Sequence, residues 1–468
     1  MLNVINSYVW GAPTLLLILG VGIYLTVGTG AIQLRWLPKA LRHFFRRMIQ
    51  PANDDGISPF QALCTALAAT VGTGNLAGVA GAIALGGPGA IFWMWICGIL
   101  GMVTKFAEAA LAVRFRVKNS NGEYVGGPMY MIEQGMGKHW RFLAVIYCFF
   151  GVVASLGVGN ATQINTVVRS ATDAMVFFGL RSGIRIQLTM GLALAALTLV
   201  LLLGGAKRIG RLAERLVPIA SLCYILLCVT VLTVNRENLS WALRAIVEGA
   251  FSPSAVTGGM VGSVFLTLRT GVSRGVFTHE AGMGTASIAH GSACVKDPLE
   301  QGMMGIVEVF LDTIVICTMT ALVILTSGIL IPYGADIGIS LTSDAFSAVL
   351  GDWVRIPLAM FLCCFAFATV LGWGVYGGRC AQYLFGTKAW IPFAVLHGIT
   401  AVISSLLKTE TVWLVAETVN GLMALPNLVA LSALSPVLFG LTKKSEGTRP
   451  SGRDHAPSSS RIEPSSPL

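Results

Sequence analysis

The sequence predicts an all-α polytopic membrane protein in which one extra N-terminal helix precedes two inverted blocks of five helices. Of its 468 residues, 54% are apolar and only 12% are charged, whereas soluble domains carry about 25% charged residues. Apolar stretches near the 20-residue length of a membrane span recur eleven times. The span that opens each block is interrupted by glycines. A water-soluble protein of this size needs far more polar surface, so that class is excluded.

The spans and their connections divide the chain into four predicted regions. These are an N-terminal helix with a basic connector (1–56), a first five-helix repeat (57–235), a second, inverted repeat (236–441) and a disordered tail (442–468). The tail is rich in Ser, Pro and Arg and too poor in apolar residues to fold. The eleven predicted spans are about 8–28, 59–85, 91–113, 143–161, 188–203, 217–234, 258–289, 303–325, 357–384, 391–407 and 412–441.

The positive charges predict the orientation. Although the formal net charge is +10, the Lys and Arg residues cluster between spans, in 30–56, 114–141, 204–216 and the tail. The positive-inside rule therefore puts these stretches in the cytoplasm, with the N-terminus outside and the C-terminus inside a bacterial-type inner membrane. No basic face is interleaved with aromatic residues, so nucleic acid is not an expected partner.

The second span contains the run Val71-Gly72-Thr73-Gly74-Asn75. Each glycine costs about 1 kcal/mol inside a helix, and unwound backbone at membrane depth is tolerated only beside a cavity or a ligand. Freed amides suit a carboxylate, and freed carbonyls suit a cation. The alternative is close helix packing through small residues.

The seventh span carries a second glycine-rich stretch, which we expect to break the helix over 268–275. Arg269 and Arg274 lie within this apolar segment, and a charge there costs about 2.5–3.5 kcal/mol on insertion scales. Glu280 is a candidate counter-ion, so a structural Arg–Glu pair is as reasonable as a gating role. Matching breaks in two halves indicate the binding site of a secondary transporter.

Polar residues elsewhere in the spans add candidates for this site. The neutral amide of Gln163 can bind an ammonium or a carboxylate, although an interhelical hydrogen bond is the alternative. Thr369 and Trp373 are four residues apart and share one helix face. A threonine hydroxyl suits a hard cation such as sodium, and the tryptophan would then wall the pocket, unless both are simply core residues.

Further ionisable residues, Glu417 among them, fall inside predicted spans. Lys105 and Glu108 are three residues apart and are expected to neutralise each other on one helix face. Glu308 and Asp312 are like-charged neighbours at a spacing of four, so one of them is a candidate proton site.

No motif indicates an enzyme. The run 271–275 matches GxSxG, but no strand precedes it. His279-Glu280 begins like a zinc-protease motif and lacks the second histidine. No ATP-binding loop is present, and no cofactor or resident metal is expected. A channel is disfavoured because the spans show no ring of like charges.

Several longer motifs resemble the alanine or glycine:cation symporter family. They are Val71–Gly78, the run 86–95 (GGPGAIFWMW), the run 101–108 (GMVTKFAE), the run 126–130 (GGPMY), Glu280–Gly284 and the run 420–427 (NGLMALPN). The resemblance covers about residues 8–441. It implies a leucine-transporter-type fold and import of a small neutral amino acid, mostly alanine or glycine and sometimes glutamine, coupled to sodium or protons. The implied partners are this amino acid, the sodium ion and the lipid bilayer, with no obligate protein partner.

The resemblance also implies residue roles. The substrate pocket would comprise Thr73, Gly74, Gln163, Thr270, Gly271, Thr369 and Trp373. The cation site would use backbone oxygens near Ala68 and Val71 with the hydroxyl of Thr369, and Asn75 would serve a second cation or a structural role. Two departures from the family pattern matter: the usual Ser-Asn-Glu reads Thr278-His279-Glu280 here, and family members usually have Ser or Thr at position 368, where this chain has Ala368. A missing hydroxyl makes weaker sodium binding or proton coupling an alternative.

Overall fold

The computed structural model of this chain describes residues 9, 11–49, 56–177, 179–335, 338–407 and 409–447. The prediction of an all-α membrane protein is confirmed. The described residues include eight helices long and apolar enough to span a membrane, or nine if the bent pair Pro59–Thr70 and Gly74–Gly86 is one span. The two other predicted spans correspond to α2 (Ala12–Gly28), which has 17 residues, and to the pair α15 and α16 (Val264–His279 and Thr285–Gly291).

The first half of the chain contains the first predicted repeat. In the labels, η denotes a short 3₁₀ or π turn. The basic connector contains two short helices that the sequence did not predict. The elements are α2, α3 (Ile32–Arg35), α4 (Leu37–Ile49), α5 (Pro59–Thr70), η1 (Gly74–Gly78), α6 (Val79–Gly86), α7 (Ala90–Arg114), β1 (Val117–Lys118), β2 (Tyr124–Val125), α8 (Pro128–Tyr130), η2 (Met131–Met136), η3 (Lys138–Trp140), α9 (Arg141–Leu156), η4 (Gly157–Ala161), α10 (Thr162–Phe177), α11 (Ile184–Leu203) and α12 (Gly205–Val234). The two strands pair antiparallel.

The second half of the chain contains the second predicted repeat. Its elements are η5 (Arg236–Asn238), α13 (Leu239–Phe251), α14 (Pro253–Thr257), α15, α16, α17 (Pro298–Val309), η6 (Phe310–Cys317), α18 (Thr318–Thr326), α19 (Ile339–Leu350), η7 (Asp352–Val354), α20 (Arg355–Phe385), η8 (Thr387–Ala389), α21 (Trp390–Ser404) and α22 (Thr409–Gly447). Helix α22 extends past residue 442, where we expected the tail to begin, and residues 448–468 of that predicted tail lie outside the described residues.

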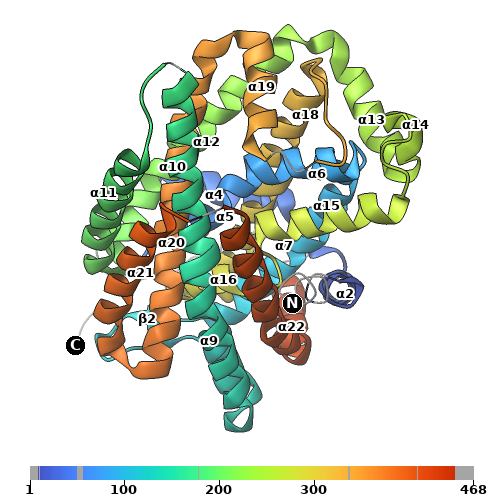
Figure 1. Cartoon of the computed structure of the whole chain (residues 1–468). Coiled ribbons are helices and arrows are strands. Elements are labelled where there is room, and N and C mark those ends of the chain that lie inside the picture. The colour runs from blue at the N-terminus through green and yellow to red at the C-terminus, as the bar shows by residue number, and fades with distance from the viewer. Residues whose placement is uncertain are drawn as a thin grey trace, which may run out of the picture.

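The broken helices lie in the middle of the bundle (Figure 1). Helix α7 packs along α17 and α15, α9 packs along α20, and α11 packs along α21. In Figure 1, α9 projects from one end of the molecule, and α13, α14, α18 and α19 gather at the other. The long helices therefore enclose α5 and α16, the elements that adjoin the two breaks.

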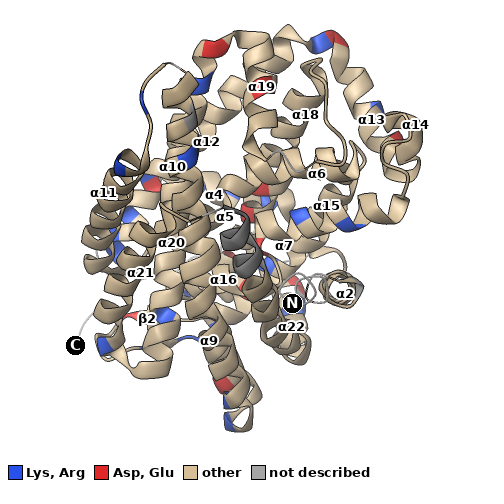
Figure 2. Cartoon of the chain, in the orientation of Figure 1, with Lys and Arg blue, Asp and Glu red and all other residues tan. Residues whose placement is uncertain are grey.

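The outer faces of α11, α21 and the second half of α12 are largely apolar. Large side chains exposed there include Leu192, Val200, Leu222, Leu226 and Ile399. Figure 2 shows the long helices tan over most of their length, with charged residues mainly near their ends and in the interior near α5 and α7. An apolar surface of this extent is suited to contact with lipid. The helices can be exposed to lipid because their backbone polar groups are hydrogen-bonded within each helix.

The second break is not where the sequence predicted it. Helix α15 is continuous through residues 268–275, and the chain leaves the helix only at Glu280. A Cβ added at Gly271 would lie 2.3 Å from the carbonyl oxygen of Ala90, so this glycine allows close packing on α7. The true break uses the left-handed backbone of Glu280, Gly282 and Gly284, whose φ angles are 53°, 93° and 77°. The predicted position of the second break was therefore wrong. Gly271 allows close helix packing, whereas Gly282 and Gly284 allow the left-handed backbone of the break.

Candidate functional site

The first break opens the backbone at the end of α5. Val71 has extended angles (φ −75°, ψ 98°), and the α5 and α6 halves meet at a bend of 51°. The Asn75 side chain steadies the opened segment, because its Oδ1 accepts a hydrogen bond from the Gly72 amide at 2.9 Å. The sequence prediction of a break at 71–75 is confirmed.

The π turn η4 brings Gln163 to this break. Its Nε2 donates to the carbonyl oxygen of Val158 at 3.3 Å, while its Oε1 is buried and has no hydrogen-bond partner among the described residues. The Thr73 hydroxyl is likewise buried and has no hydrogen-bond partner among the described residues. Buried polar atoms are normally paired, so two unsatisfied oxygens beside unwound backbone indicate a place for a polar ligand.

Helix α20 supplies the next two side chains. The Thr369 hydroxyl lies 3.0 Å from the carbonyl oxygens of both Ala68, on α5, and Phe365, one turn earlier. The Trp373 indole lies beside η4, where a Cβ on Gly159 would come within 2.1 Å of the Trp373 Cβ. The Trp373 Nε1 donates to the Glu280 carboxylate at 3.1 Å.

Glu280 also belongs to this site, although we did not predict it there from the sequence. It ends α15 in the left-handed region, is 3% exposed, and accepts a second hydrogen bond from Thr285 at 2.7 Å. A non-glycine residue in this region is uncommon and often marks a functional site. From the sequence we assigned Glu280 a role only as a candidate counter-ion to Arg269 and Arg274, although it also begins the family motif Glu280–Gly284. The available signal was the run Glu280–Gly284, in which two glycines closely follow a carboxylate within an apolar span.

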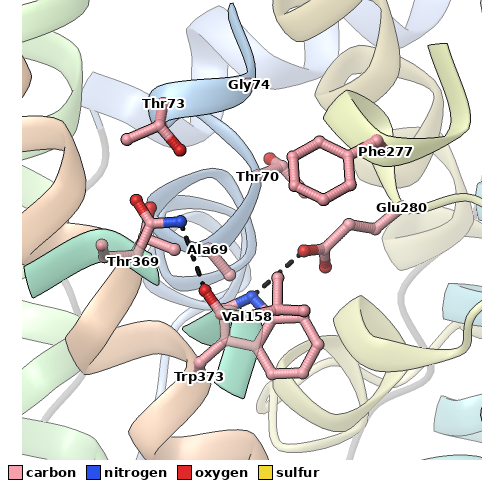
Figure 3. Close-up of a pocket in the computed structure, with 11 residues that line it drawn as sticks. Ala69, Thr70, Thr73, Gly74, Val158, Phe277, Glu280, Thr369 and Trp373 are labelled. Carbon is pink, nitrogen blue, oxygen red and sulfur yellow. Dashed lines mark hydrogen bonds between the residues drawn. The ribbon is translucent and has the colours of Figure 1, made fainter. Parts of the chain in front are cut away.

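These side chains line one small cavity (Figure 3). Figure 3 shows Glu280 and Trp373 joined by a hydrogen bond on one side and Thr73 on the other, with Phe277 and Thr70 between. The space open to the centre of a water molecule is about 10 Å³, about the room that one water needs. The lining residues are Ala69, Thr70, Gly72, Thr73, Gly74, Val158, Gln163, Phe277, Glu280, Thr369 and Trp373. An amino acid therefore enters only if these walls move apart.

Five of the seven predicted substrate residues line this cavity, and two do not. The five are Thr73, Gly74, Gln163, Thr369 and Trp373. Thr270 and Gly271 lie on the continuous part of α15, where they pack near Gly86 and against Ala90 and Trp93. The other lining residues were not assigned to the pocket from the sequence, although Gly72 lies within the predicted break; they are Ala69, Thr70, Gly72, Val158, Phe277 and Glu280.

The predicted cation residues lie in three different settings. Ala68 and Thr369 are in direct contact, as given above. The Asn75 Nδ2 instead donates to the Asp312 carboxylate at 2.7 Å, and Val71 lines a separate apolar cavity of about 60 Å³. The contact between Ala68 and Thr369 is therefore the candidate cation site with the clearest geometry.

The expected pairing of Lys105 with Glu108 does not occur. The Lys105 ammonium lies 2.9 Å from Glu308 on α17, and the same carboxylate contacts His290 of α16 at 2.9 Å. All three side chains are at most 1% exposed. Packing of α7 against α17 supplies a closer partner than the neighbour on the same helix.

A family model described as the sodium:alanine symporter family matches residues 1–459. The chain belongs to this family. Sodium/alanine symporter AgcS of Methanococcus maripaludis is 42% identical over 95% of this chain and 96% of that protein. Probable sodium/glutamine symporter GlnT of Bacillus subtilis is 37% identical over 97% of this chain and 91% of that protein.

The fold of the symporter matches a solved structure. The crystal structure of MhsT in complex with L-phenylalanine aligns with a TM-score of 0.57 at 16% identity, covering 84% of this chain and all of that one. The predicted leucine-transporter-type fold is thereby confirmed. The chain is a multi-pass membrane transporter, a sodium-coupled amino-acid symporter, and not an enzyme.

Proposed function

We propose that this symporter imports a small neutral amino acid, alanine or glycine foremost, together with sodium. Substrate and ion bind between the two breaks, and the helix bundles rock about them in alternating access. The orientation predicted from the positive charges, with the N-terminus outside the inner membrane and the C-terminus in the cytoplasm, belongs to this proposal.

The observation that carries the proposal is the Glu280 carboxylate in the cavity wall. The Glu280 carboxylate and the Gln163 Oε1, which has no partner among the described residues, line the same cavity, and such a pair of acceptors suits the ammonium group of an amino acid. Both atoms are buried, which strengthens a charge-assisted hydrogen bond. Glu280 and Gln163 would therefore hold the amino end of the substrate.

The carboxylate of the substrate would face the first break. The Thr73 hydroxyl has no partner among the described residues and can donate to a carboxylate oxygen. It lies across the cavity from Glu280 (Figure 3). The two ends of an amino acid would thus meet groups of matching polarity on opposite walls.

The walls favour a short side chain. Trp373 and Phe277, two large aromatic residues, line the cavity, and Trp373 packs directly against the backbone of Gly159. Two relatives are named for alanine and for glutamine. We take alanine or glycine as the substrate and keep glutamine as the alternative.

Sodium would bind where the Thr369 hydroxyl meets the Ala68 carbonyl oxygen, since hard cations prefer oxygen ligands. The neighbouring Ala368 is buried and offers no hydroxyl. The proton is therefore the alternative coupling ion, and Asp312 and Glu308 are the candidate residues to carry it.

The test is uptake of labelled L-alanine into liposomes that contain the purified protein. An inward sodium gradient, an inward proton gradient and no gradient are compared. We expect accumulation with sodium, and competition by unlabelled glycine but not by glutamine. Accumulation driven only by protons would contradict the sodium assignment, and the absence of alanine uptake under every gradient would contradict the substrate.

A further inference from the structure

A buried carboxylate outside the cavity holds the second break in shape. Glu108 on α7 is fully buried, and its Oε1 accepts three hydrogen bonds. The donors are the amides of Gly282 at 2.9 Å and Gly284 at 3.1 Å and the Asn427 Nδ2 at 2.8 Å. One carboxylate oxygen thus satisfies two backbone groups that the interrupted helix leaves without helical partners.

Asn427 on α22 closes the arrangement. Its Nδ2 also donates to the carbonyl oxygen of Gly282 at 2.9 Å. The linker lies so close that a Cβ on Gly284 would come within 2.7 Å of Asn427 and 2.4 Å of Pro128. The break is therefore held from α7 and α22, two helices that belong to different halves of the chain.

This contact bears on the cavity because Glu280 and Thr285 flank the held residues. Glu280 adopts φ 53° and contacts Trp373, and Thr285, the first residue of α16, donates to Glu280. Backbone in sparsely populated regions persists only where its surroundings fix it. Without an acceptor at Glu108, the linker loses the two backbone hydrogen bonds that hold it between Glu280 and Thr285.

We propose that Glu108, together with Asn427, is a positioning residue that fixes the second break and thereby sets the Glu280 carboxylate in the substrate cavity. Glu108 does not line that cavity, so it acts through the backbone of 282–284. The inference about transport rests on the proposed function, whereas the inference about backbone shape does not.

The experiment is hydrogen–deuterium exchange of the full-length protein in detergent, without substrate, followed in peptides that cover 280–285. In Glu108→Ala we expect exchange there to accelerate roughly tenfold, while peptides from α11 and α12 keep their rates. Glu108→Gln retains an oxygen acceptor and should stay within about threefold of the unmodified protein, since a neutral acceptor loses only part of the bond. Unchanged exchange at 280–285 in Glu108→Ala, or equal acceleration everywhere, would overturn the proposal.

Thr104→Ala is the matched control. Thr104 is buried one turn before Glu108 on α7, and its hydroxyl donates to Leu100 within the same helix. It should leave exchange at 280–285 unchanged. If Glu108→Ala does not yield folded protein, Asn427→Ala takes its place, with the same faster exchange expected and unchanged exchange again overturning the proposal.

A second measurement separates positioning from general stability. In liposomes, Glu108→Ala should raise the KM for L-alanine about tenfold, and Glu108→Gln should restore most of it. A lower maximal rate at unchanged KM would contradict the positioning role. If the unmodified protein takes up no alanine, the proposed function fails, and the exchange result still decides the role of Glu108.

Discussion

The two helix breaks differ in how they are opened and in what holds them. The first has no residue with positive φ between Val71 and Asn75 and is steadied by its own Asn75. The second requires left-handed backbone at three positions and is held by Glu108 and Asn427 from other helices. The first break presents the Thr73 hydroxyl, which has no partner among the described residues, to the cavity, and the second presents the Glu280 carboxylate. The difference indicates that the second break depends more on its surroundings.

The strongest test of this comparison removes the charge at the second break. Glu280→Gln keeps the size of the side chain but turns a charged acceptor into a neutral one. We expect alanine uptake to fall by roughly 100-fold, since hydrogen bonds to charged groups contribute about 1.5–3 kcal/mol. Initial rates of labelled alanine uptake in liposomes measure this. Uptake within threefold of the unmodified protein would remove Glu280 from substrate binding.

Each break contains a glycine, so replacing it by alanine compares how well the two breaks tolerate an added side chain. Gly284→Ala introduces a Cβ at φ 77° and within 2.4 Å of Pro128, whereas Gly74→Ala meets its nearest atom at 3.2 Å. We expect Gly284→Ala to lower the thermal midpoint by more, because left-handed alanine alone costs about 1–2 kcal/mol. Thermal unfolding of both variants in the same detergent measures the difference. An equal or larger loss in Gly74→Ala would reverse the comparison.

The contact between the first break and α20 gives a smaller, ion-specific effect. Thr369→Ala removes the hydroxyl that meets the Ala68 carbonyl oxygen, so the sodium concentration for half-maximal uptake should rise about tenfold. Thr369→Ser keeps the hydroxyl and serves as the control. A sodium dependence that is the same in all three proteins would exclude this contact as the ion site.

The smallest expected effect comes from restoring a hydroxyl beside the first break. Ala368→Ser adds an oxygen next to Thr369 and should lower the half-maximal sodium concentration by about two- to fivefold, the range of one modest polar contact. Sodium titration of alanine uptake checks it. A rise in that concentration would mean that residue 368 does not face the ion.

Glycine patterns predicted the first helix break correctly but not the second, because glycine can either open a helix or allow two helices to pack closely. The run 71–75 combined glycines with polar residues inside a span, and the break lies there. Glycines at 271 and 275 carry the same pattern but allow α15 to approach α7, which the sequence of α15 alone does not distinguish from a break. Glu280 was misassigned because its partners, Trp373 and Thr285, are identified only once α15, α16 and α20 are packed together.

The central claim is that the amino acid binds between the two breaks, and a structure determined with L-alanine and sodium tests it most directly. We expect the ammonium nitrogen of the bound alanine within hydrogen-bond distance of Glu280 and of the Gln163 Oε1, with the alanine carboxylate toward Thr73. Alanine found instead in the cavity of about 230 Å³ that Arg355 and Leu76 help to line, with nothing between the breaks, would contradict it.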